Sequence, residues 1–296
     1  MKVIIPMSGE GKRFKDAGYT KLKPLIFVDG KPILEHVVDL FSPDDDFLFV
    51  CSSEHLKDKT LELEKFLKNL RPHSKIIEVN SHKLGPNYAI LAASELLDDD
   101  PVFVSYCDFN LKWNREDFLR CIRRTPVHSA AVCYKGFHPH LLNPNVYAGV
   151  RVDDNMFARE VKEKHSFTKN KMDTWQQSGL FYFSSGNLLR EYCERAFREG
   201  WLMKGESYTS LLFDPMIGDG LVSLVYPAEH FCQWGTPEDL EEYEAWARLF
   251  AEKYGKKKGV TEIPSSREKN VYIRYAPDSD EYRKSYEYWE KYFFGE

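Results

Sequence analysis

Residues 3–14 read VIIPMSGEGKRF, and residues 23–25 read KPL. The apolar run at residues 3–7 is continuous and stops abruptly at a polar segment that contains two glycines. Continuous apolar runs of this length are typical of strands that are buried on both faces, as in sheets covered by helices on either side. The stretch therefore predicts an α/β fold whose first strand leads directly into a glycine turn.

The loop after this strand has the features of a polyphosphate site. Gly9 and Gly11 carry no Cβ, so backbone N–H groups in the turn can close on an anion. Arg13 adds a planar, permanently charged group that suits phosphate oxygens. Lys23 brings a second cation towards the same strand end. We therefore expect this loop to bind a polyphosphate.

Two widespread phosphate loops do not fit these residues. The dinucleotide-binding fingerprint needs a third glycine at the position where this chain has Phe14. The P-loop needs Gly-Lys-Ser/Thr at the start of a helix, and this chain has Arg13 in the last of these places. Taken alone, Gly9-x-Gly11 is a weak motif that also fits a surface turn beside an arginine.

The composition describes an ordinary globular chain, with 43% hydrophobic and 29% charged residues among 296. A net charge of −5 provides no basic face for nucleic acid. The six cysteines form no Cys-x-x-Cys pair, which favours buried free thiols in a reducing compartment. The apolar N-terminal run is too short for a signal peptide, and no run approaches the ~20 apolar residues of a membrane helix. We therefore expect a cytoplasmic protein that binds neither nucleic acid nor membranes.

Strand-like and helix-like patterns alternate along the chain, which predicts a doubly wound, mostly parallel, Rossmann-like sheet. Ligands on such sheets lie at the carboxyl ends of the strands, where the glycine loop falls. In the less regular second half we expect a small accessory sheet beside the cleft. The expected strands are 2–7, 47–51, 75–79, 101–106, 128–134, 146–152 and 178–184, and the expected helices are 31–41, 54–70, 88–97, 115–124, 186–199 and 237–254.

The chain changes character towards its end. We divide it into a main domain, residues 1–254, and a C-terminal extension, residues 255–296, with the lysine-rich stretch 256–259 as a linker. Four aromatic residues share one face of a predicted helix that Asp278 or Ser279 would cap: Tyr282, Tyr286, Trp289 and Phe293. We interpret this stripe as packing on the chain's own domain. The alternative is a homo-oligomer contact, because aromatic residues are enriched at subunit interfaces.

The glycine turn becomes much more specific in combination with Arg13 and Lys23-Pro24-Leu25. The combination resembles the signature of the sugar-phosphate nucleotidyltransferases, which have a GT-A-like fold. These enzymes join a nucleoside triphosphate (NTP) to a sugar 1-phosphate or a similar phosphorylated small molecule. The resemblance extends over residues 1–250, with its motifs in the family's order. It implies that Arg13 binds the outer phosphates and that Lys23 serves the α-phosphate and the acceptor phosphate, which makes these two the catalytic residues.

The resemblance also implies the remainder of the nucleotide site. The segment around Gly85, before a helix rich in small residues, would face the nucleobase, and a glycine there would let a flat ring approach closely. CTP, UTP and dTTP are the expected nucleotides. The expected nucleotide-binding residues are Met7, Ser8, Gly9, Glu10, Gly11, Lys12, Gly85, Pro86 and Asp108.

Asp108 follows the apolar run 101–107 and is the expected ligand of Mg²⁺. Mg²⁺ prefers one or two carboxylates together with phosphates and water, and the resemblance implies a metal-binding Asp at this strand end. The family usually has a second metal-binding Asp two residues before the Gly-Thr of its closing motif. This chain has the neutral Gln233 there, so Glu229 or Asp239 would have to substitute, or Asp108 would act alone.

The acceptor side of the site is also implied by the resemblance. Glu163 would bind acceptor hydroxyls, Lys164 the acceptor phosphate, and Gly179 would lead a strand beneath the acceptor. The closing motif begins at Trp234 and places Thr236 and Pro237 at the N-cap and first position of a late helix.

Two segments, residues 135–140 and 233–237, resemble the subgroup linked to bacterial capsule and surface polysaccharide synthesis. His138 and His140 in the first segment lack a surrounding Cys/His cluster, so we interpret them as structural or as substrate contacts. The segment 135–140 could alternatively form a loop over the cleft.

Two other functions remain open at this point. One is a CTP-dependent cytidylyltransferase for a phosphorylated amine, amino acid or polyol. The other is a catalytically inactive nucleotide-binding regulator, which the neutral Gln233 would explain. The sequence identifies neither the base nor the acceptor.

Overall fold

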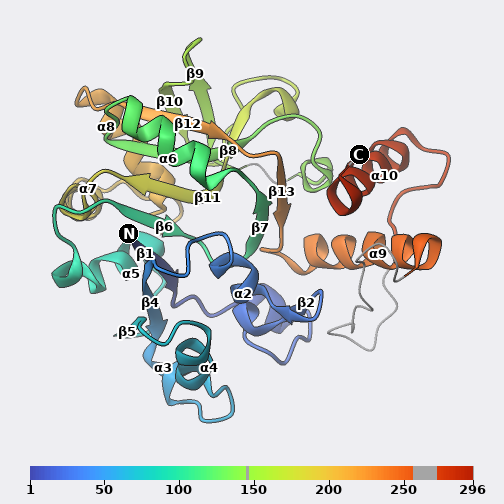
Figure 1. Cartoon of the computed structure of the whole chain (residues 1–296), viewed down its shortest axis with the longest axis horizontal. Helices are drawn as coiled ribbons and strands as arrows, with labels where there is room; N and C mark the ends of the chain where they lie inside the picture. Colours follow the sequence, from blue (N-terminus) through green and yellow to red (C-terminus); the bar gives the residue numbers. More distant parts are fainter. Residues whose placement is uncertain (145–146, 256–271, 296) are drawn as a thin grey trace.

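The computed structural model describes residues 1–144, 147–255 and 272–295 (Figure 1). Its centre is a nine-stranded sheet. The strands are β1 (Lys2–Met7), β4 (Asp46–Ser52), β5 (Lys75–Val79), β6 (Val102–Ser105), β8 (Ser129–Tyr134), β9 (Gly149–Val152), β10 (Ala158–Lys162), β11 (Trp175–Phe183) and β12 (Ser223–Pro227). Their order is β10-β9-β11-β6-β1-β4-β5, with β8 paired to β11 and β12 paired to β8.

Four strands from the first half of the chain, β5, β4, β1 and β6, lie side by side and run parallel. β11 lies next to β6 but runs antiparallel to it and to β8. β9 and β10 form an antiparallel pair at the edge. The predicted doubly wound, mostly parallel sheet is confirmed, and the second half supplies its antiparallel strands.

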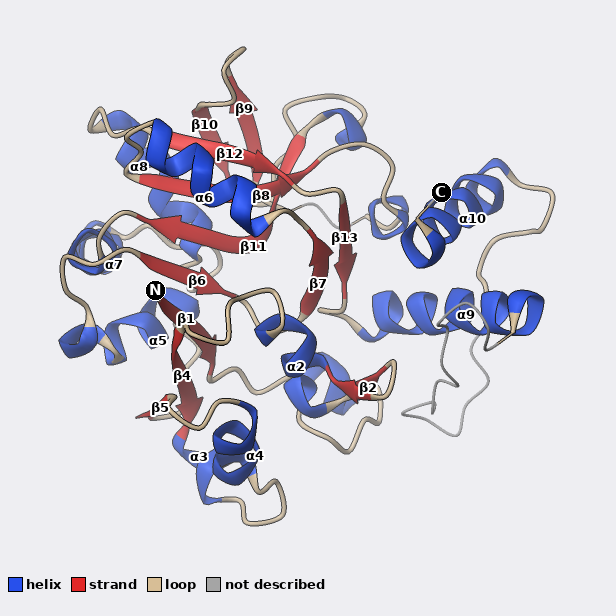
Figure 2. Cartoon of the chain, in the orientation of Figure 1, coloured by secondary structure: helices blue, strands red, loops and turns tan. Residues whose placement is uncertain are grey.

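Helices cover both faces of this sheet (Figure 2). The helices of the described residues are α1 (Lys12–Asp16), α2 (Ile33–Val38), α3 (Ser53–Lys57), α4 (Leu63–Leu70), α5 (Pro86–Ala92), α6 (Arg115–Arg124), α7 (Gly186–Glu199), α8 (Phe213–Gly218), α9 (Pro237–Tyr254) and α10 (Asp280–Phe294). In the described part of the chain, none combines the length and apolar character needed to cross a bilayer.

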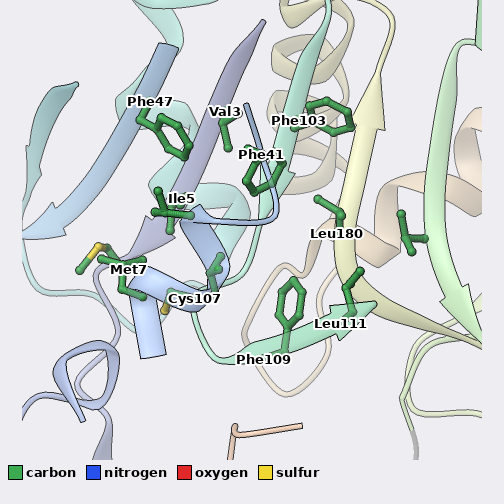
Figure 3. Packing of buried hydrophobic residues seen from close by; sticks show 14 of the residues in the cluster. Val3, Ile5, Met7, Phe41, Phe47, Phe103, Cys107, Phe109, Leu111 and Leu180 are labelled. Atoms are coloured by element: carbon green, nitrogen blue, oxygen red, sulfur yellow. The ribbon is translucent and has the colours of Figure 1, made fainter. Parts of the chain in front are cut away.

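Alternating residues of β1 belong to different cores, because successive side chains of a strand point to opposite faces. Val3 and Ile5 belong to the core that includes Leu34 of α2 and Phe118 of α6 (Figure 3). Ile4 belongs to the core on the other face, which includes Leu189 of α7. A continuous apolar strand is therefore what this position requires.

The predicted helix at residues 54–70 is divided into α3 and α4. The side chain of Asp58 accepts hydrogen bonds from the backbone N–H and the hydroxyl of Thr60 at 2.9 and 2.6 Å. Asp side chains that satisfy nearby backbone groups in this way favour turns over helix. The turn therefore interrupts an otherwise helical pattern.

Two small antiparallel sheets complete the α/β body, and they confirm the expectation of an accessory sheet. β2 (Phe27–Val28) pairs with β3 (Lys31–Pro32). β7 (Phe109–Lys112) pairs with β13 (His230–Gln233), and this ribbon lies between the main sheet and α9 and α10 (Figure 2).

The predicted C-terminal helix is present as α10, and the Ser279 hydroxyl caps it by accepting a hydrogen bond from the N–H of Tyr282 at 3.1 Å. Tyr288, Trp289 and Tyr292 are buried in a third core with α9. The Tyr288 hydroxyl donates to the carbonyl of Phe231 in β13 at 2.7 Å. Of the predicted stripe, Trp289 is buried and Tyr282, Tyr286 and Phe293 are half-buried against the same core, so the stripe packs on the chain's own domain. The proposed linker at residues 256–259 lies outside the described residues.

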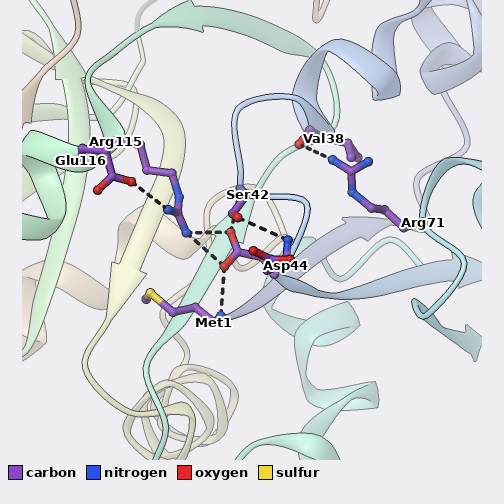
Figure 4. Close-up of polar contacts among 8 residues, drawn as sticks. Met1, Val38, Ser42, Asp44, Arg71, Arg115 and Glu116 are labelled. Atoms are coloured by element: carbon purple, nitrogen blue, oxygen red, sulfur yellow. Dashed lines mark hydrogen bonds and ion pairs between the residues drawn. The ribbon is translucent and has the colours of Figure 1, made fainter.

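Polar contacts tie the start of β1 to its neighbours (Figure 4). The buried Asp45 carboxylate accepts from the Met1 ammonium group at 2.9 Å and pairs with Arg115 of α6 at 2.8 Å. A buried carboxylate needs partners of this kind to offset its desolvation. A separate contact in the same view involves Arg71, which donates to the carbonyl of Val38, the last residue of α2, at 3.3 Å.

All six cysteines are free thiols, as expected, and five of them are buried. Burial raises the pKa of the Cys51 thiol to about 12, so it stays protonated at neutral pH.

Candidate active site

A cavity of about 480 Å³ opens at the carboxyl ends of β1 and β6. This volume lies in the range of small-molecule sites. The cavity brings together every residue expected at the nucleotide and catalytic positions: Met7, Ser8, Gly9, Glu10, Gly11, Lys12, Arg13, Lys23, Gly85, Pro86 and Asp108. Residues separated by up to a third of the chain therefore meet at one edge of the sheet.

The glycine turn forms one wall of this cavity. Gly11 has φ +64 and precedes α1, in a left-handed conformation that residues with a Cβ rarely adopt. A Cβ placed on Gly11 would lie 3.7 Å from the Cβ of Lys23, which is ordinary contact. A Cβ on Gly9 would meet no atom within 4 Å. The two glycines thus differ: Gly11 shapes the backbone, and Gly9 leaves space at the cavity wall.

Lys23 and Asp108 form an ion pair inside the cavity, with Nζ and Oδ2 2.7 Å apart. Their side chains are only 20% and 21% exposed. Burial alone would lower the pKa of the Lys23 ammonium group, but the negative charge of Asp108 and the hydrogen bond to it outweigh burial and raise that pKa. Lys23 therefore stays positively charged. It is held beside Asp108, shortly after the end of β6.

The closing motif lies next to Asp108, because β13, which precedes the motif, pairs with β7, which follows Asp108. The N–H of Trp234 donates to the carbonyl of Asp108 at 3.0 Å. A Cβ placed on Gly235 would lie 2.4 Å from Nε2 of Gln233 and 3.0 Å from Oδ2 of Asp108. The Gln233 amide and the Asp108 carboxylate thus occupy the same small region, and Gly235 leaves room for both.

Neither Glu229 nor Asp239 supplies a second carboxylate to this cavity. Glu229 lines a different hollow, beside Lys112 and Arg115. Asp239 is buried, accepts from the Thr236 hydroxyl at 2.8 Å, and has its pKa raised to about 6 by burial. The described residues also contain no group of three or more His, Cys, Asp or Glu side chains that could hold a metal.

Gly85 lines the cavity and also makes room for another part of the chain. Its φ is +86, and a Cβ there would lie 2.6 Å from the carbonyl oxygen of Ser207 and 2.8 Å from its nitrogen. The N–H of Ser207 donates to the carbonyl of Leu84 at 2.8 Å, and the N–H of Asn87 donates back to Ser207 at 3.1 Å. The missing Cβ therefore lets another part of the chain approach, although Gly85 still lines the cavity.

The residues expected to bind the acceptor lie beside the cavity but do not line it. Glu163 is half-buried, accepts a hydrogen bond from the Ser210 hydroxyl, and has its pKa raised by desolvation. The ammonium group of Lys164 lies 5.1 Å from the ring centre of Tyr208, which does line the cavity. A Cβ on Gly179, at φ +97, would approach the ring of Tyr106 to 3.0 Å.

The matches to other proteins agree with this geometry. The model of the MobA-like NTP transferase domain matches residues 3–159, which is more than half of the chain. The chain belongs to the MobA-like NTP transferase family.

The sequence relatives include a sugar-phosphate nucleotidyltransferase by its name, in agreement with the family resemblance. The bifunctional protein GlmU of Methanocaldococcus jannaschii is 24% identical over 274 residues, which are 93% of this chain and 59% of that protein. The mannose-1-phosphate guanylyltransferase catalytic subunit beta of Danio rerio is 27% identical over 193 residues, or 64% of this chain and 51% of the relative. The chain thus spans little more than half the length of these relatives.

A solved structure supports the fold. The inositol-1-phosphate CTP transferase of T. maritima superposes with a TM-score of 0.63 at 17% identity, over 88% of this chain and 97% of the other. At this identity the similarity concerns the fold alone.

Several cavity residues received no role from the sequence, among them His82, Tyr106, Glu206 and Tyr208. Glu206 and Tyr208 come from the loop before the 3-10 helix Thr209–Leu212. Packing of that loop against Gly85 brings them to the cavity, and no local motif marks them.

The prediction that residues 135–140 form a loop over the cleft is wrong. His138 and His140 are buried and do not line the cavity. Nε2 of His140 lies 3.0 Å from the Tyr134 hydroxyl, and the His138 ring lies 5.1 Å from that of Tyr288 in α10. Burial lowers the pKa of His138 to about 4. These neutral rings support the C-terminal helix, in agreement with the structural alternative.

Proposed function

We propose that this protein is a nucleotidyltransferase that transfers a nucleoside monophosphate from an NTP to a sugar 1-phosphate or a similar phosphorylated small molecule. The proposal rests mainly on one observation: the glycine turn, Arg13, Lys23 and Asp108 line the same cavity at the carboxyl edge of the sheet. The name of one sequence relative, a mannose-1-phosphate guanylyltransferase, supports the same reaction class.

In the proposed reaction, a phosphate oxygen of the acceptor attacks the α-phosphorus of the NTP. The bond from that phosphorus to the leaving pyrophosphate breaks in line, and no covalent bond to the protein is formed. The protein contributes positioning and fixed positive charge. Lys23 is held for this purpose by Asp108 at 2.7 Å, and Arg13 extends from the start of α1 into the same cavity.

Mg²⁺ is the proposed cofactor, and Asp108 is the residue that would hold it. One carboxylate fits this ion when phosphate oxygens and water supply the other ligands. When bound, the ion would neutralise charge on the triphosphate. Gln233 beside Asp108 can add an amide oxygen but no charge, so a site with two carboxylates is not part of the proposal.

Glu163, Lys164 and Gly179 are the proposed acceptor-side residues. Glu163 and Lys164 lie beside Tyr208 and Tyr106, which form the cavity wall on that side. A role in capsule or surface polysaccharide synthesis rests on the segments 135–140 and 233–237 and is proposed on that resemblance alone.

The test is a Mg²⁺-dependent pyrophosphate-release assay in which CTP, UTP, dTTP, GTP and ATP are each combined with sugar 1-phosphates and phosphorylated amines and polyols. Release with one pair identifies base and acceptor together, and a phosphorylated amine or polyol would identify the cytidylyltransferase alternative. Arg13→Ala should abolish most of the release, whereas Lys15→Ala, on α1 outside the cavity, should not. Nucleotide binding without release for any acceptor would favour the regulator instead.

A further inference from the structure

Ser8 and His82 meet at the cavity wall although 74 residues separate them in the chain. Ser8 follows the last residue of β1 and is 6% exposed. His82 lies in the segment between β5 and α5, and both side chains line the cavity. Oγ of Ser8 and Nε2 of His82 are 2.9 Å apart, which is a hydrogen bond.

The other ring nitrogen of His82 decides the direction of this bond. The backbone N–H of Leu84 donates to Nδ1 of His82 at 3.2 Å. A neutral imidazole has one donor and one acceptor nitrogen, and a backbone N–H can only donate. Nδ1 is therefore the acceptor, and Nε2 carries the proton that is donated to Ser8.

The neutral form of the ring is favoured by its surroundings. Burial lowers the pKa of His82 below its ordinary value, and the carboxylate of Glu206 opposes this shift only in part. The ring also lies against Tyr88, with centroids 4.6 Å apart, which fixes its plane. At neutral pH the ring is thus held as a donor to Ser8.

This arrangement leaves the proton of the Ser8 hydroxyl unused by His82. A serine hydroxyl has one donor and two acceptor sites, and His82 occupies an acceptor site. Within the described residues, the Ser8 hydroxyl has no second partner. Because Ser8 lines the cavity, its proton is available to a ligand bound there.

We propose that His82 is a positioning residue that sets the Ser8 hydroxyl as a hydrogen-bond donor to a phosphate oxygen of the bound nucleotide. This inference rests on the proposed function for the identity of the ligand, and it deepens that function by assigning a residue pair to phosphate binding. It gives His82 no contact with the base.

The test uses four variants and a ligand that has no base. His82→Phe keeps a ring beside Tyr88 but removes both hydrogen bonds, and His82→Gln retains an N–H donor near the position of Nε2. Ser8→Ala removes the hydroxyl, and the double variant Ser8→Ala/His82→Phe tests whether the two act as a unit. His73→Phe, at an exposed histidine that does not line the cavity, is the matched control.

Binding of inorganic triphosphate and of CTP and UTP is measured by calorimetry, with thermal unfolding as a check on the fold. We expect Ser8→Ala and His82→Phe each to weaken triphosphate binding about 10-fold, the typical effect of one hydrogen bond to a charged group. His82→Gln should bind within about 3-fold of the wild type, and the double variant no more weakly than Ser8→Ala, because coupled residues are not additive. His73→Phe should change nothing.

Three results would overturn the inference: no triphosphate binding by the wild-type protein, additive losses in the double variant, or a loss in His82→Phe for CTP and UTP but not for triphosphate. The last result would place His82 at the base. Failure of the proposed function is a separate outcome, since triphosphate could bind with the expected coupling while no acceptor releases pyrophosphate.

Discussion

Gly85 and Gly9 both line the cavity, but only Gly85 is packed against other backbone atoms. Replacing each of them by alanine therefore separates an effect on folding from an effect on ligand binding. A Cβ on Gly85 would lie 2.6 Å from a backbone oxygen and 2.8 Å from a backbone nitrogen of Ser207, at φ +86. A Cβ on Gly9 would meet no atom within 4 Å, and its φ lies outside the left-handed region. We predict that Gly85→Ala destabilises the protein and that Gly9→Ala impairs ligand binding without doing so.

The magnitudes follow from these contacts. The left-handed backbone costs ~1–2 kcal/mol for a residue with a Cβ, and overpacking against backbone adds ~1–3 kcal/mol. For a chain of this size the sum lowers the Tm of Gly85→Ala by roughly 5–10 °C. Gly9→Ala should stay within about 0.5 kcal/mol of the wild type. Its methyl group would displace a phosphate at the cavity wall, which weakens nucleotide binding on the order of 10- to 100-fold.

Thermal unfolding of both variants without ligand gives the stability comparison, and calorimetric titration with the productive NTP gives the affinity. Gly220→Ala is a control for the backbone alone, because φ there is +82 and no atom lies within 4 Å. It should lower Tm by less than Gly85→Ala and leave nucleotide binding unchanged. The reasoning is refuted if Gly9→Ala loses several degrees of Tm with unchanged affinity, or if Gly85→Ala is as stable as Gly220→Ala.

Three further predictions concern other parts of the molecule. Lys23→Met keeps the apolar stem but removes the charge at the cavity, so turnover should fall on the order of 10²-fold or more in the pyrophosphate assay, whereas Lys15→Met should retain wild-type rates. Burial raises the pKa of Glu242 from 4.5 to about 7, so its protonated form stabilises the fold at low pH and this stabilisation is lost as pH rises through about 7. Glu242→Gln should therefore be more stable than the wild type at pH 8 by on the order of 1–3 kcal/mol but not at pH 4, while Glu252→Gln, which is exposed on the same helix, should show no such difference. Trp289→Ala should cost ~3–5 kcal/mol in chemical unfolding, because this buried ring joins α10 to α9; an unchanged midpoint would contradict the packing of α10 on its own domain.

Local features of the sequence were sufficient for much of the fold. The strand at 2–7 and the helices at 186–199 and 237–254 have the predicted bounds. Thr236 caps α9, its side chain accepting from the N–H of Asp239, with Pro237 at the first position. Such features depend on a few neighbouring residues, whose hydrogen bonds and periodicity are visible in one stretch of chain.

The cavity residues of the glycine turn could also be predicted, for a related reason. A buried strand followed by a glycine turn must place that turn at a sheet edge, and Asp108 follows another strand that ends at the same edge. Because β1 and β6 are parallel neighbours, their carboxyl ends lie at the same edge, and this brings the glycine turn and Asp108 together. The distance of 2.7 Å between Lys23 and Asp108 could not be predicted, because it depends on the fold of the segment between α1 and α2.

By itself, then, the sequence determined the alternation of elements, the helix caps and the glycine turn after the first strand, because each depends on local periodicity and turn chemistry. Tertiary structure alone decided the antiparallel insertion of β11, the placement of Glu206 and Tyr208 through Gly85, the approach of both Gln233 and Asp108 to Gly235, and the bond between Ser8 and His82. These depend on which distant segments share an edge or a face. Which segments pair depends on how the whole chain buries its apolar surface, so it cannot be predicted from any short stretch of the sequence.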